Sequence, residues 1–157
     1  MSVLGALPNL HPAVVHFPIA LFVTAWGLDL AGLLLRRRVS LDAMAVILYF
    51  LALLAAGAAA FTGKLASQSF ESLPVESEKL VGEHGDWAFF TLVAFFAVAI
   101  LRWETYWRDR GKPGPGSRKM RLLALVAALA ALVLLYRTIE LGGTLVYGHG
   151  VGVSPGV

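Results

Sequence analysis

The residues in this sequence best suited to bind a metal ion or a haem are its four histidines, His11, His16, His84 and His149. A neutral imidazole is a good ligand for haem iron, copper or zinc, and histidines at the ends of bundle helices often build such sites. The chain has no cysteine, which excludes iron–sulfur clusters, thioether-attached haem and cysteine nucleophiles. A cofactor would therefore be held by His, Asp, Glu, Met or the backbone.

The composition indicates that these histidines are positioned by membrane-spanning helices. Of the 157 residues, 58% are hydrophobic and only 15% are charged, and the mean hydropathy is +0.74. Apolar stretches long enough to cross a bilayer are expected at about 12–35, 41–63, 85–103 and 120–140, followed by a glycine-rich tail at 142–157. The predicted fold is all-α, an integral membrane four-helix bundle formed by a single domain, 1–157.

The segments between these spans carry expectations of their own. Residues 64–83 are polar and acidic and predict an outer loop that contains a short interfacial helix ending before Pro74. Arg102 is expected to extend from the third span to the membrane interface. Gly142 and Gly143 are expected to end the last helix, leaving a tail that is either disordered or folded back on the bundle.

Lysine and arginine predict how the bundle lies in the membrane. The connections at 36–40 and 102–121 hold ten of these residues, and the other side holds three, Lys64, Lys79 and Arg137. Because basic connections stay in the cytoplasm, both termini are expected on the non-cytoplasmic side, together with all four histidines. The formal charge of +3 comes from basic residues that flank the apolar spans. Because of this placement, no nucleic-acid partner is expected.

The histidines suggest specific ligand pairs. For one haem we expect His16 and His84 as the axial ligands of the iron, because they lie at similar depth on different helices. For two haems, His11 and His149 are the candidates for the second, although His11 could equally be only a helix cap. His11 and His16 lie about 140° apart around a regular helix, so they are not expected to bind one small ion together.

Two further charged groups have alternative roles. Arg137 either holds a haem propionate or forms a plain ion pair with Glu140, three residues further along the chain. Asp29 is a carboxylate inside an apolar segment, which makes it a candidate proton relay, or it pairs with Arg36 near the cytoplasmic end. Phosphate loops, metalloprotease motifs and catalytic triads are absent from the sequence, so no catalytic residues are predicted.

The sequence HPAVVHFPIAL at 11–21 resembles the opening of a bacterial membrane-protein family known as the DUF2231 domain. The sequence GGTLVYGHGVGV at 142–153 is similar to the family's closing segment, and His84 resembles the histidine that opens its third span. The resemblance covers essentially the whole chain. It implies a multi-pass protein of the bacterial inner membrane, often found alongside respiratory or cytochrome components, without naming a ligand.

Three interpretations of the function follow. The first is a small b-type cytochrome whose outer histidines bind haem b and transfer electrons, within or beside a respiratory or photosynthetic complex, to a periplasmic cytochrome or another carrier. The second is a non-catalytic accessory subunit that packs against other membrane subunits. The third is a copper or zinc site, which needs three or four of the histidines in near contact.

Overall fold

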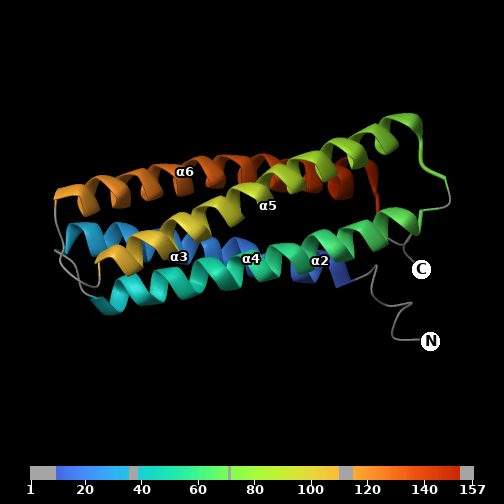
Figure 1. The fold of residues 1–157 in the computed structure, drawn as a ribbon. Helices are drawn as coiled ribbons and strands as arrows, with labels where there is room; N and C mark the ends of the chain where they lie inside the picture. Colours follow the sequence, from blue (N-terminus) through green and yellow to red (C-terminus); the bar gives the residue numbers. More distant parts are fainter. Residues whose placement is uncertain (1–9, 36–38, 71, 110–114, 153–157) are drawn as a thin grey trace.

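The chain folds into four long helices that run alternately up and down. A computed structural model describes residues 10–35, 39–70, 72–109 and 115–152. Its elements, in chain order, are α2 (His11–Val14), α3 (His16–Leu34), α4 (Val39–Gln68), α5 (Val75–Asp109), α6 (Pro115–Gly143) and the π-helical turn η2 (Thr144–Gly148). Figure 1 shows α3, α4, α5 and α6 as a bundle whose described chain begins and ends at the same end. We call that end the terminal end.

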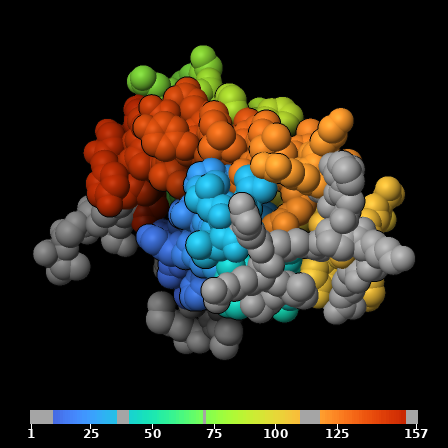
Figure 2. Space-filling view, turned by 90° about the vertical axis from the view of Figure 1, so that its left-hand side faces the viewer, coloured from blue at the N-terminus to red at the C-terminus, as the bar shows by residue number. Residues whose placement is uncertain are grey.

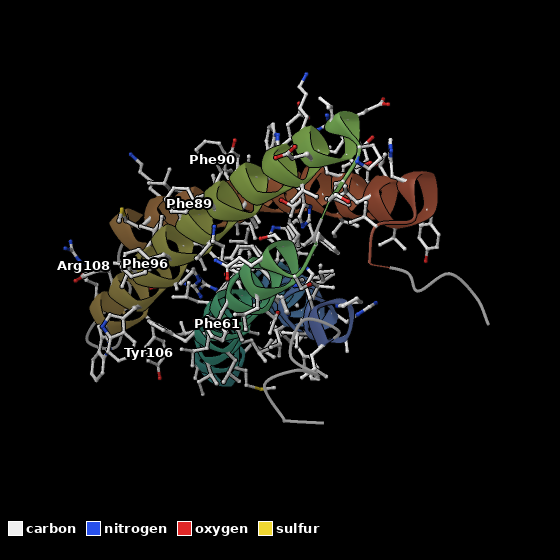
Figure 3. All side chains as sticks on the ribbon, turned by 90° about the vertical axis from the view of Figure 1, so that its right-hand side faces the viewer. Phe61, Phe89, Phe90, Phe96, Tyr106 and Arg108 are labelled. Carbon is white, nitrogen blue, oxygen red and sulfur yellow. The ribbon has the colours of Figure 1, made fainter. Side chains whose placement is uncertain are left out.

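The predicted all-α membrane fold is confirmed. The described residues contain no strand, and four helices are long and apolar enough to cross a membrane. Large apolar side chains on the outer surface are exposed, among them Phe61, Phe89, Phe90 and Phe96 (Figure 3). In a bilayer such side chains contact the lipid chains, so their exposure requires no protein partner.

Helices α4, α5 and α6 are longer than the expected spans, and the predicted outer loop is wrong because most of 64–83 is helical. Helix α4 continues to Gln68 and α5 begins at Val75, so only residues 69–74 connect them and the interfacial helix is not formed. An apolar stretch marks only the part of a helix inside the hydrocarbon. The flanking Glu and Lys residues are good helix formers, and Glu76 and Glu78 are favourable in a first turn, so the helix extends beyond the apolar stretch.

A break between α2 and α3 separates the first two histidines. Val15 interrupts the helix, and its backbone N–H still donates to the His11 carbonyl at 3.1 Å. Pro18 has no N–H with which to bond the carbonyl four residues earlier, which explains the local interruption. The short helix α2 and the long helix α3 therefore form one slightly distorted span, His11–Leu34.

The core of the bundle consists mainly of alanines around a few large side chains. The buried residues of this cluster are Phe22, Ala25, Ala45, Tyr49, Ala52, Phe95, Val98, Ala99, Ala128, Ala131 and Leu135. Phe22 of α3 stacks on Phe95 of α5 with ring centroids 3.7 Å apart. Small residues let helix backbones approach closely in a membrane, and Figure 2 shows α6 lying against α3 when the bundle is viewed from the end opposite the termini.

Packing is uneven along the bundle. Helix α5 has seven buried residues between Thr91 and Asp109, whereas none of its residues from Glu78 to Phe90 is buried. Figure 1 shows α5 diverging from α4 toward the terminal end, and Figure 3 looks onto that splayed end. Within α5, the stretch toward the terminal end is therefore the less buried part, and it is where His84 lies.

Candidate functional site

Two histidines from distant parts of the chain meet at the terminal end. The rings of His11 on α2 and His84 on α5 have centroids 6.3 Å apart and planes at 80° to each other. Both side chains are half-buried. The pair joins the first helical hairpin, α3–α4 with the preceding α2, to the second hairpin, α5–α6.

Each of these rings is fixed by a backbone carbonyl of a neighbouring helix. His11 Nδ1 lies 3.0 Å from the Ala59 carbonyl oxygen on α4, and His84 Nδ1 lies 3.1 Å from the Thr138 carbonyl oxygen on α6. A carbonyl only accepts hydrogen bonds, so Nδ1 of each neutral ring carries the proton and donates it. The lone pair is then on Nε2, which is how metal-binding histidines are commonly oriented.

Threonine hydroxyls surround these anchoring points. Thr62 Oγ1 lies 3.2 Å from His11 Nδ1, and the hydroxyls of Thr91 and Thr138 lie 2.9 Å apart between α5 and α6. Thr62 and Thr91 are buried. No sequence motif pointed to these three residues, although isolated hydroxyls within apolar stretches are a usable signal, because such groups need a partner inside a membrane.

Two glycines make room for the rings. A Cβ atom at Gly63 of α4 would lie 2.9 Å from His11 Cε1, and one at Gly142 of α6 would lie 3.2 Å from His84 Cε1. By contrast, a Cβ at Gly57 or Gly143 would meet nothing within 4 Å. Gly63 and Gly142 therefore allow close packing of α4 and α6 against the imidazoles.

His16 lies outside this contact. Its side chain is exposed at the start of α3, and within the described residues the ring contact of His84 is with His11. His11 is also not the residue that caps the helix, because that position belongs to Leu10. The structure therefore brings His84 together with His11, whereas the sequence suggested His16.

His149 lies in a tail that folds back onto α5. After α6 the chain continues through η2, so the glycines at 142 and 143 do not end helical structure as expected. Gly150 adopts φ +64°, and the Val151 N–H donates to the Leu145 carbonyl at 2.9 Å, which turns the chain back and buries Val151. His149 Nδ1 lies 3.3 Å from the buried Ser77 hydroxyl. Ser77 is two helical turns from His84, so His149 shares the end of the bundle but not the ring pair.

Comparison with known proteins places the chain in a family. The family described as a predicted membrane protein (DUF2231) matches residues 7–155. The chain belongs to this family. No curated protein and no solved structure matches it.

In this DUF2231 protein Arg137 forms an ion pair on the surface of α6. Its Nη1 lies 2.6 Å from Glu140 Oε2, and both side chains are about half exposed. The plain ion pair, one of the two roles expected for Arg137, is therefore formed.

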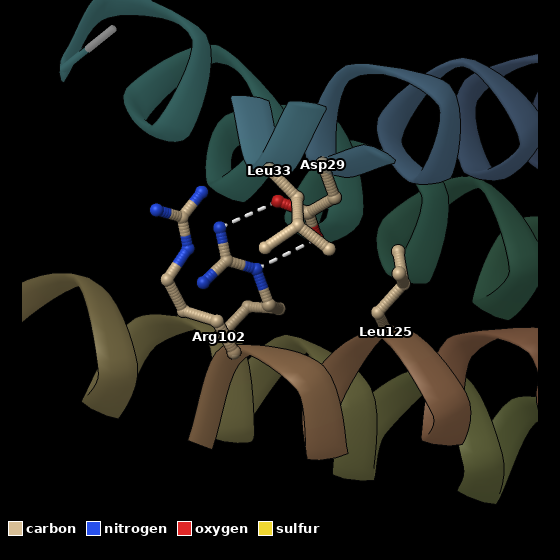
Figure 4. A pocket seen from close by; sticks show the side chains of 5 residues that line it. Asp29, Leu33, Arg102 and Leu125 are labelled. Atoms are coloured by element: carbon tan, nitrogen blue, oxygen red, sulfur yellow. Dashed lines mark hydrogen bonds and ion pairs between the residues drawn. The ribbon is translucent and has the colours of Figure 1, made fainter. Parts of the chain in front are cut away.

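At the opposite end of the bundle Asp29 has a different partner from the expected one. Arg102 Nε and Nη2 donate to the two carboxylate oxygens of Asp29 at 2.7 and 2.6 Å (Figure 4). Arg36 lies outside the described residues. The expectation that Arg102 extends to the interface is wrong, because its side chain is only 2% exposed and the Asp29 carboxylate holds it inside the bundle.

A second ion pair extends this contact to all four helices. Arg121 Nη2 of α6 donates to Asp42 Oδ1 of α4 at 2.6 Å, and Arg102 Nη2 lies 3.8 Å from the same oxygen. We call Asp29, Asp42, Arg102 and Arg121 the ion network. Each of the four long helices contributes one member.

Within the described part of the chain, no three His, Cys, Asp or Glu side chains gather into a group able to hold a metal ion. The two imidazoles in ring contact at the terminal end are those of His11 and His84. Two imidazoles are enough to bind a haem iron, because the macrocycle supplies four further ligands.

Proposed function

We propose that this DUF2231 protein is a small membrane cytochrome in which His11 and His84 are the two axial ligands of one haem b. The distance between the two rings carries the proposal. Two imidazoles on opposite sides of one metal ion, each bound at about 2 Å, have ring centroids roughly 6 Å apart. The observed separation of 6.3 Å agrees with this geometry.

The surroundings of the two rings fit a flat ligand. Both Nδ1 atoms are engaged with carbonyl oxygens, which leaves both Nε2 atoms as ligands. Helix α5 diverges from α4 at this end, and its residues from Glu78 to Phe90 are not buried. A macrocycle would enter between the two hairpins beside this stretch of α5, which buries no side chain.

The proposed chemistry is electron transfer. Haem supplies a one-electron redox centre when bound, and ligation by two histidines leaves no iron position for a substrate. The chain's own residues hold the ligands: the carbonyls of Ala59 and Thr138 orient the imidazoles and increase their basicity. Arg137 adjoins Thr138 and is the candidate partner for a propionate in place of Glu140.

The proposal includes an orientation and partners. The excess of lysine and arginine at the other end of the bundle supports a terminal end that faces the periplasm in a bacterial inner membrane. An electron carrier on that side and further membrane subunits are the proposed partners. His16 and His149 lie at the same end and are candidates for a second cofactor only.

The test is an absorbance spectrum of the detergent-purified protein, reduced minus oxidised, with pyridine haemochrome quantification. We expect about one haem b per chain with a bis-histidine spectrum. His11→Ala and His84→Ala should each abolish that spectrum, whereas the matched variants His16→Ala and His149→Ala should keep it. Circular dichroism verifies that all four variants remain helical.

Other results would contradict the proposal. Retention of the bis-histidine spectrum in both His11→Ala and His84→Ala would remove the axial assignment. A wild-type protein without haem, produced in cells supplied with haem, would leave two interpretations. Metal analysis then separates a copper or zinc protein from an accessory subunit.

A further inference from the structure

The ion network borders a small cavity inside the bundle, far from the histidine pair. The cavity has a volume of about 10 Å³ and is lined by Asp29, Leu33, Arg102, Arg121 and Leu125 (Figure 4). Three of its five lining side chains are charged in a bundle whose interior is otherwise mostly apolar. This combination of volume and charge limits what the cavity can contain.

The size and polarity of the cavity indicate its occupant. A volume of about 10 Å³ corresponds to one water molecule, and cavities that stay empty in proteins are apolar ones. Here two guanidinium groups offer N–H donors and the Asp29 carboxylate offers acceptors. A water molecule can accept from the former and donate to the latter.

Charge excludes the other small ligands. A cation would face the guanidinium groups of Arg102 and Arg121 on the cavity wall. An anion would find those groups already neutralised, because Arg102 binds Asp29 and Arg121 binds Asp42 at 2.6 Å in both cases. A neutral ligand with both donors and acceptors remains.

We propose that this cavity is a binding site for one ordered water molecule that bridges Arg121 to the Asp29–Arg102 pair. Buried charges in a membrane are costly unless they are well hydrogen-bonded, and a water at this position would add hydrogen bonds to those of the ion pairs. Arg121 is 10% exposed and Arg102 is 2% exposed, so the water exchanges from the Arg121 side. The proposal is independent of haem binding.

The site is also bounded toward the centre of the bundle. Phe22 precedes Asp29 by two turns on α3, and Phe95 precedes Arg102 by two turns on α5. Since these two rings stack at 3.7 Å, the water is confined to the end of the bundle away from the histidines.

Infrared difference spectroscopy tests the proposal on the full-length protein in hydrated proteoliposome films. Spectra are recorded in H2¹⁶O and in H2¹⁸O, and water bands are identified by their isotope shift. Leu125→Phe and Leu33→Phe extend side chains into the cavity from two helices. Leu129→Phe adds the same ring to α6 at an exposed position and serves as the matched control.

We expect an isotope-sensitive band of a bound water in the wild-type protein and in Leu129→Phe, and its loss in both cavity-filling variants. Two fillings are used because one of them could distort the ion pairs, and circular dichroism and size-exclusion chromatography identify a variant that does not fold. Absence of the band from the wild type, or its persistence in a folded cavity-filling variant, would overturn the proposal.

Discussion

Arg102 binds both carboxylate oxygens of Asp29, although the two residues are 73 positions apart in the chain. The pair reflects a wider segregation of charge in the ion network. The first hairpin, α3–α4, contributes only the acids Asp29 and Asp42, and the second hairpin, α5–α6, contributes only the bases Arg102 and Arg121. The two hairpins thus meet through complementary charges at one end and through the histidine pair at the other.

Arg102→Met should strongly destabilise the bundle. It leaves the Asp29 carboxylate buried without its partner, and removal of one member of a buried pair costs about 3–5 kcal/mol. Thermal or denaturant unfolding in detergent, followed by circular dichroism, measures the loss. Arg108→Met is the matched control on the same helix, because Arg108 pairs with Glu104 on the surface at 3.0 Å and such pairs contribute about 0–1 kcal/mol.

Replacement of both members of the buried pair should cost less than replacement of one. In Asp29→Leu/Arg102→Met no uncompensated charge remains, and apolar substitutes for buried ion pairs are often neutral. The same unfolding measurement applies. A double variant less stable than Arg102→Met would show that the pair itself, and not the orphaned charge, dominates the energetics.

The two hairpins should associate when they are produced as separate polypeptides divided within 69–74. Spanning hairpins are stable in a bilayer on their own, and their docking depends on side-chain packing and polar pairs. Co-purification with a tag on the first hairpin measures the association. Asp29→Arg/Asp42→Arg in that hairpin should abolish it, and Arg102→Asp/Arg121→Asp in the other should restore it. Equal recovery of all combinations would contradict a role for charge complementarity.

Gly63→Ala should weaken haem binding about tenfold, a loss typical of changes behind a metal ligand. The added Cβ would lie 2.9 Å from His11 Cε1, so the ring must move away from its position. Haem content after purification and titration of the haem-free protein measure the effect. Gly57→Ala, on the same helix with nothing within 4 Å, should bind haem as the wild type does.

Gly142→Ala should have a smaller effect than Gly63→Ala. Its Cβ would lie 3.2 Å from His84 Cε1, a contact that a shift of a few tenths of an ångström relieves. Gly143→Ala is the neighbouring control without a contact within 4 Å. In haem titrations the loss of affinity should therefore be largest for Gly63→Ala, smaller for Gly142→Ala and smallest for the two control variants. A different order would show that the glycines do not act through the imidazoles.

The sequence predicted the number of helices and the end at which the histidines gather, because both follow from apolar stretches and chain reversal. It did not predict which histidine faces inward. His11 and His16 lie about 140° apart around a helix, so only one can point into the bundle, and the choice depends on how the helix is rotated. A depth similar to that of His84 favoured His16. In the structure, packing against α4 makes His11 the inward-facing histidine.

The partner of Asp29 could not be predicted from the sequence for a similar reason. The basic residue nearest to Asp29 in sequence on the same side is Arg36. Arg102 meets Asp29 only because α3 and α5 lie diagonally in the folded bundle, with both side chains directed into its interior. The lengths of α4, α5 and α6 were underestimated because hydropathy marks only the part of a helix in the hydrocarbon and not where its backbone hydrogen bonds end. The inward-facing histidine and the partner of Asp29, by contrast, are both determined by contacts between helices.

The stack of Phe22 on Phe95 has a consequence for the membrane itself. It lies between the histidine pair and the ion network along both α3 and α5, within a core made largely of alanine. A continuous file of water along the bundle axis would conduct protons and dissipate the membrane potential. The stacked rings stand in the way of such a file between the polar sites at the two ends of the bundle.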